Sequence, residues 1–81
     1  MESINEALDY DLAIEILQSM RVKTERTIDS AQTETERKEA QALLKLYNME
    51  EKILNGWGND YSRQSVYDKV FRFYAPLVRS V

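Results

Sequence analysis

The spacing of apolar residues along the chain follows the period of an α-helix, and no window shows the two-residue alternation of a β-strand. Between residues 4 and 20, apolar side chains return every three or four positions, which places them on one helical face. A second series with this spacing runs from Ala40 to Leu54, and a third, the densest, runs from Val66 to Val81. The pattern therefore predicts an all-α chain of three helices.

Polar residues separate the first two series. Between residues 21 and 39 apolar residues are sparse, whereas threonine, serine and aspartate are frequent, which favours caps and turns. Thr33 and Glu36 have the spacing of a capping box, so the second helix is expected to begin beside them. Ser3 and Glu6 show the same spacing before the first series. One uninterrupted helix through both series is the alternative, since no residue between them forbids it.

Two glycines and one proline mark the remaining breaks. Gly56 after Asn55 is a good helix stop, because glycine adopts the left-handed conformation without steric cost. Asp60, Ser62 or Ser65 is expected to cap the third helix. Pro76 removes one helical hydrogen bond and crowds the preceding turn, which predicts a kink or a stop near Tyr74.

Together these signals predict one domain, residues 1–81, built as a small three-helix bundle. Residues of about 4–28 and 34–55 form a long antiparallel hairpin with a protruding polar tip, and a third helix, about 62–75, packs across its open end. A chain of this size buries only about 60–65% of the surface that it exposes when unfolded. Such domains often rely on a disulfide, a metal or a second copy of the chain for stability.

The absence of histidine and cysteine narrows the chemistry that the chain can support. The commonest catalytic bases, nucleophiles and zinc ligands are missing, and there is no nucleophile elbow, P-loop or dinucleotide motif. Asp11 and Glu15 lie one turn apart and carry the oxygen ligands that Mg²⁺ prefers, but nothing else in the pattern completes a site. We therefore expect no catalytic residue, cofactor, metal or small-molecule substrate, and interpret the acidic pair as a solvated helix face.

Charge is distributed unevenly along the chain, whose net charge is −3. The first 20 residues carry five acidic side chains and no basic one, whereas residues 61–81 carry four basic side chains against one acidic. A dimer that pools two basic ends could bind nucleic acid, although a specific DNA reader usually shows a denser positive footprint. The residues of this alternative are Arg63, Lys69, Arg72 and Arg79.

Large apolar and aromatic side chains near the C-terminus are the candidates for contact with a partner. Trp57 and Tyr61 lie in and beside the second connection. They either close the open end of the bundle or anchor a partner, since Trp and Tyr are common interface hot spots. Leu77, Val78 and Val81 follow Pro76 and are expected to contact another chain.

The third series presents two adjacent apolar stripes, which together are wider than two mostly polar helices can cover. Residues 66–74 are the expected contribution to the chain's own core, and the excess predicts a partner surface. The favoured function is a small non-enzymatic protein–protein interaction module, a regulator or inhibitor that acts as a homodimer or binds a partner protein. The alternative is a dimeric nucleic-acid-associated regulator. The start of the chain shows no secretory signal, and no apolar run approaches the ~20 residues of a membrane span, so a cytoplasmic location is expected.

Overall fold

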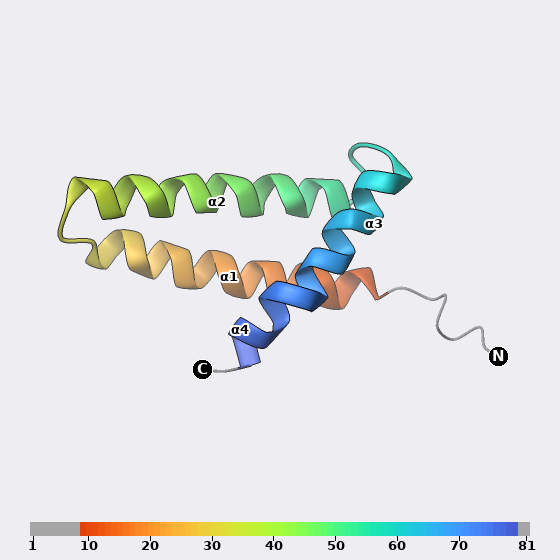
Figure 1. The fold of residues 1–81 in the computed structure, drawn as a ribbon, viewed down its shortest axis with the longest axis horizontal. Helices are drawn as coiled ribbons and strands as arrows, with labels where there is room; N and C mark the ends of the chain where they lie inside the picture. The colour runs from red at the N-terminus through yellow and green to blue at the C-terminus, as the bar shows by residue number, and fades with distance from the viewer. Residues whose placement is uncertain (1–8, 80–81) are drawn as a thin grey trace.

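The computed structural model describes residues 9–79, and within them every element is helical (Figure 1). Two long helices form an antiparallel hairpin, and a continuous C-terminal helix, residues 60–79, crosses the first of them at the open end of the hairpin. The all-α three-helix bundle is thereby confirmed. The elements are α1 (Tyr10–Ser30), α2 (Glu34–Leu54), α3 (Asp60–Lys69), the π-helical turn η2 (Val70–Tyr74) and α4 (Ala75–Arg79).

The hairpin turns through three residues, 31–33, between α1 and α2. Ala31 has an extended backbone, and the Thr33 side chain accepts a hydrogen bond from the Glu36 amide at 3.1 Å. The Glu36 carboxylate accepts in return from the Thr33 amide at 3.3 Å, which completes the predicted capping box. These groups satisfy backbone donors that are unpaired only at the start of a helix. The alternative prediction, one uninterrupted helix through both series, is therefore wrong. The tip protrudes beyond the C-terminal helix, as expected (Figure 1).

The described part of α1 begins later than the predicted residue 4. Asp9 has non-helical backbone angles, φ −93° and ψ 79°, and its carboxylate accepts a hydrogen bond from the Leu12 amide at 2.9 Å. This is the geometry of an N-cap, and aspartate is among the best residues for it. The capping box predicted from Ser3 and Glu6 lies outside the described residues.

The connection between α2 and α3 confirms the predicted stop and corrects the predicted cap. Gly56 and Gly58 have φ values of 107° and 108°, a region that side chains rarely tolerate. Asn59, rather than a residue between 60 and 65, caps α3, because its side-chain oxygen accepts from the Ser62 amide at 2.8 Å.

Pro76 does not stop the C-terminal helix. The helix continues past its predicted end near residue 75 and reaches Arg79. The turn before the proline is widened to a π-helix, in which the Ala75 amide donates to the Val70 carbonyl. This widening gives room to the proline ring, which would crowd the Arg72 carbonyl in a regular α-helix. Pro76 is the second residue of α4 and follows the π-turn directly.

The core lies at the open end of the hairpin, where all three long segments meet. The farther half of the hairpin adds only two buried residues, Thr24 and Ala40. No described helix combines the length and apolarity that crossing a membrane requires. The core side chains are Ala13, Ile16, Leu17 and Met20 of α1, Tyr47 and Leu54 of α2, and Val66, Val70, Tyr74 and Ala75 of the C-terminal helix.

Candidate protein-interaction surface

A buried polar cluster joins α2 to the C-terminal helix. Glu50 is only 4% exposed, and its carboxylate accepts hydrogen bonds from the Tyr74 hydroxyl at 2.8 Å and the Lys69 Nζ at 2.7 Å. Burial raises the pKa of Tyr74 to about 12; the Glu50 hydrogen bond adds to this effect and the Lys69 ammonium opposes it. The hydrogen bond to Glu50 also raises the pKa of Lys69. At neutral pH the cluster is a satisfied carboxylate–ammonium–phenol set, which fixes the angle between the two helices.

Two rows of exposed apolar side chains diverge from this cluster. On α2, Leu46 and Leu43 lie one and two turns before Glu50 and are 40% and 45% exposed. On the C-terminal helix, Phe73 lies within the π-turn and Leu77 lies in α4; they are 58% and 50% exposed. Lys69 and Tyr74, five residues apart across the π-turn, both contact Glu50 of α2, and Phe73 and Leu77 lie next to and beyond Tyr74 along the C-terminal helix. We name these four residues the apolar wedge.

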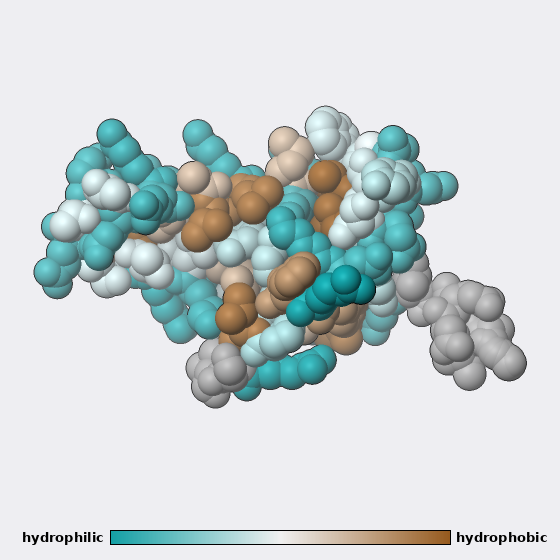
Figure 2. Space-filling view, viewed as in Figure 1, coloured by the Kyte–Doolittle hydropathy of each residue, from teal (hydrophilic) through white to brown (hydrophobic). Residues whose placement is uncertain are grey.

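The oblique path of the C-terminal helix creates the wedge. This helix starts beside the end of α2 and then crosses α1, so its distance from α2 grows toward the hairpin tip (Figure 1). Figure 2 shows apolar side chains on the same face of the molecule over α2 and over the C-terminal helix. Toward the tip the wedge continues into a 270 Å³ groove between α1 and α2, which Leu43 and Glu39 line with Thr27 and Ala40.

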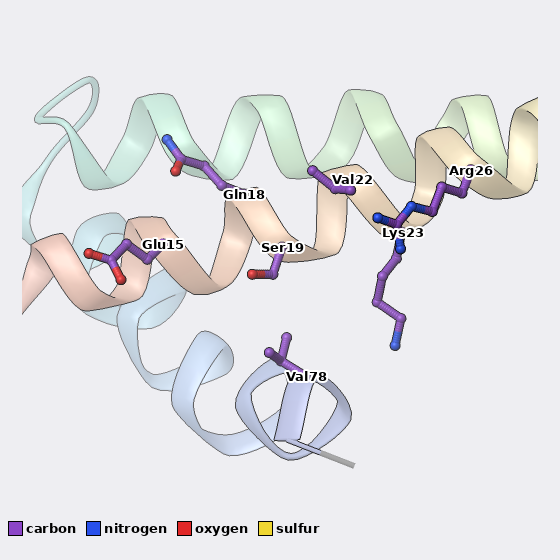
Figure 3. A pocket seen from close by; sticks show the side chains of 7 residues that line it. All are labelled: Glu15, Gln18, Ser19, Val22, Lys23, Arg26 and Val78. Atoms are coloured by element: carbon purple, nitrogen blue, oxygen red, sulfur yellow. The ribbon is translucent and has the colours of Figure 1, made fainter. Parts of the chain in front are cut away.

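The predicted contact residues after Pro76 behave differently from one another. Leu77 belongs to the wedge, whereas Val78 is half-buried and packs against the chain's own core. Val78 points toward Ser19 of α1, with Glu15 and Lys23 on either side (Figure 3). Val81 lies outside the described residues.

Trp57 and Tyr61 do not close the bundle. Trp57 is 62% exposed and Tyr61 is 81% exposed, so the interpretation of Trp57 as a lid is wrong. The two aromatic side chains stand at the α2–α3 connection, which the two left-handed glycines shape, and we name them the aromatic corner. This corner lies at the opposite end of the C-terminal helix from Leu77.

The four basic residues of the nucleic-acid alternative are divided by the structure. The Arg63 Nε donates to the Leu54 carbonyl at 3.0 Å, and the guanidinium lies 4.0 Å from the centre of the Tyr10 ring. Lys69 is held by Glu50. Arg72 and Arg79 are exposed and pair with no carboxylate in the described part of the chain. A continuous basic stripe therefore does not form.

A groove of about 620 Å³ runs between α1 and α4 (Figure 3). Glu15, Ser19 and Lys23 follow one another along one side of it at four-residue spacing, but no hydrogen bond among the described residues links the Ser19 hydroxyl to Lys23. A serine nucleophile needs a base within about 3 Å. Residues 9–79 also contain no cluster of three or more acidic side chains that could hold a metal ion. The groove is open to solvent and encloses little volume on all sides, so it offers little to a small molecule.

Sequence reasoning missed Glu50, although its position carried a signal. Glu50 lies three residues after Tyr47 and four before Leu54, so it falls on the apolar face of α2. A carboxylate there has to find buried partners, and Lys69 and Tyr74 provide them.

Comparison of the chain with protein-family models, with curated proteins and with solved structures gave no significant match.

Proposed function

We propose that this chain is a small non-enzymatic protein–protein interaction module, a regulator or inhibitor that acts as a homodimer or by binding a partner protein. The apolar wedge carries this proposal: its four large apolar side chains, on α2 and on the C-terminal helix that packs against α2, are each at least 40% exposed. Monomeric proteins rarely expose contiguous apolar patches beyond a few hundred Å², and larger patches mark interaction sites. The proposed setting is the cytoplasm, a reducing compartment in which proteins rarely carry disulfides.

The aromatic corner offers a second point of contact. Tyr61 and Trp57 each expose more than half of their surface, and such side chains supply much of the binding energy at interfaces. The nucleic-acid alternative has less support, because Arg63 and Lys69 are already bound within the chain.

Photo-crosslinking tests the proposal directly. A photoreactive phenylalanine analogue at position 73, 46 or 57, introduced in living cells of the native host, is expected to give a discrete protein adduct from at least one position. The analogue at Gln41, which is exposed on another face of α2, serves as the control. Equal, diffuse labelling from all four positions would count against an interaction module.

A further inference from the structure

We propose that the groove between α1 and α4 binds an acidic, amphipathic peptide segment of a partner protein. The apolar side chains of this segment pack on Val22 and Val78, and its carboxylates pair with Lys23 and Arg26. The inference rests on the proposed function and adds a second surface, whose partner is defined by its chemistry.

The groove has the form that a peptide segment needs. It lies between two helices, because α1 provides one wall and Val78 of α4 provides the other (Figure 3). Most of the surface that it exposes is apolar: Val22 is 45% exposed, and long side chains such as those of Lys23 and Arg26 add their methylene stems. A groove of this kind, open along one side, receives the apolar face of a helix or an extended segment laid along it.

Two cations stand unpaired at one end of the groove. Lys23 and Arg26 lie three residues apart on α1, so they are neighbours on the helix surface and repel one another. Both side chains are exposed, and no carboxylate of residues 9–79 forms an ion pair with either of them. A carboxylate placed between the two would offset this repulsion. Charge complementarity therefore favours an acidic occupant.

Glu15 borders the opposite end of the groove (Figure 3). It lies eight residues before Lys23 and eleven before Arg26, which corresponds to about 12 and 16 Å along a helix. These distances exceed the Debye length of about 8 Å at physiological ionic strength, so Glu15 does little to neutralise the two cations. It does repel a uniformly anionic surface, and nucleic acids and lipid membranes are bound by denser sets of cations. A peptide can carry its carboxylates at one end, and twelve helical residues span about 18 Å.

Selection from a phage-displayed library of random 12-residue peptides, with the full chain as bait, tests the chemistry of the occupant. The enriched peptides are expected to combine leucine, isoleucine or phenylalanine with two or more acidic residues. Enrichment of basic or uncharged peptides, or of no peptide, would overturn the acidic occupant.

Fluorescence anisotropy with an enriched acidic peptide, labelled at one end, locates the site. The chain that carries both Lys23→Glu and Arg26→Glu is expected to bind at least about 10-fold more weakly, because two attractions become repulsions. The chain with Lys38→Glu and Lys45→Glu is the matched control, since it changes the net charge equally on the surface of α2 alone, and its affinity should stay within about threefold of the wild type. Val22→Ser removes apolar contact without a change of charge and should weaken binding about fivefold or more. Unchanged helical circular dichroism shows that the variants fold.

The outcomes separate this inference from the proposed function. If the control variant lost as much affinity as the groove variant, net charge alone would explain the binding, and the groove would be overturned as the site. Crosslinking from positions 73, 46 and 57 does not depend on the groove, so a discrete adduct together with a failed selection overturns the acidic peptide and keeps the interaction module. No discrete adduct and no enriched peptide overturn both.

Discussion

At the scale of single residues, Glu50 controls the junction between α2 and the C-terminal helix. Its carboxylate has two donors, one from a π-helical tyrosine and one from the lysine that precedes the π-turn. Removing the carboxylate leaves the Tyr74 hydroxyl buried without an acceptor, which costs more than the net value of the hydrogen bond.

We expect Glu50→Ala to lower the free energy of unfolding by about 2–3 kcal/mol, and Glu50→Gln, which keeps one acceptor, by about 1 kcal/mol. Urea denaturation followed by circular dichroism measures both. Glu25→Ala, an exposed position on α1, should stay within about 0.5 kcal/mol of the wild type. If Glu50→Ala behaved like Glu25→Ala, the cluster would have no part in holding the two helices together.

The raised pKa of Tyr74 predicts a loss of stability in base. The unfolded chain releases this phenol proton near pH 10, whereas the folded chain keeps it to about pH 12. The unfolded state therefore binds fewer protons in that window, and the free energy of unfolding falls as the pH rises from 10 to 12. The raised pKa of Lys69 has the same sign: its contribution is complete below pH 10.5 and is lost above it.

Urea titrations at several pH values between 9 and 12 check this, with pH 9 as the reference at which both contributions are intact. Tyr74→Phe should decline less steeply than the wild type, and Tyr61→Phe, which alters an exposed phenol, should decline with the wild-type slope. Parallel curves for all three proteins would contradict the assignment.

At the scale of elements, the helix ends were predicted well where they depend on interactions between residues that are close in sequence. Thr33 with Glu36, and Gly56 after Asn55, act through neighbours in sequence, so their roles could be inferred. The π-turn could not be inferred from the sequence. It depends both on the space that the Pro76 ring needs and on the packing of the residues on either side of it against α1 and α2. For the same reason the helix was expected to end too early.

The capping box makes the start of α2 testable. Thr33→Ala removes the acceptor of the Glu36 amide and should destabilise the chain by about 1 kcal/mol. Thr35→Ala changes an exposed residue with no role in the cap and should be neutral or slightly stabilising, since alanine is the better helix former. Chemical denaturation measures the free energy of unfolding of the two variants. Equal changes in this free energy would show that the capping hydrogen bond does not stabilise the chain.

At the scale of the whole molecule, stability is concentrated at one end. The core unites three segments at the open end of the hairpin, whereas the tip has only two helices and few buried side chains. Neither arm of the hairpin has a complete core without the C-terminal helix, and isolated helices are marginal in water.

A chain ending at residue 59 is therefore expected to lose most of its helical circular dichroism at 25 °C. In the full chain, amide hydrogen exchange should slow progressively from the tip toward Leu17 and Leu54. A truncated chain that melts cooperatively near the temperature of the full chain would show that the hairpin folds alone.

The fold followed from helical periodicity, but the arrangement of the apolar wedge did not. Periodicity assigns each residue to a face of its own helix, and it does not show which part of that face a neighbouring helix will cover. The exposure of Leu43 and Leu46 depends on the crossing angle of the C-terminal helix, which is set by long-range contacts such as that between Glu50 and Lys69. Arg63 was likewise proposed for nucleic acid because its partners, the Leu54 carbonyl and the Tyr10 ring, are distant in sequence.

The π-turn has a consequence for how this chain can vary. A π-turn closes over five residues where an α-turn closes over four, so it accommodates one extra residue without a loop. Deletion of one residue between positions 71 and 73 should restore an ordinary α-helix and rotate everything after it by about a quarter turn relative to the residues before it. A homologue one residue shorter at this point would thus keep the bundle while presenting a different surface, and a change of partner could arise from the loss of a single codon.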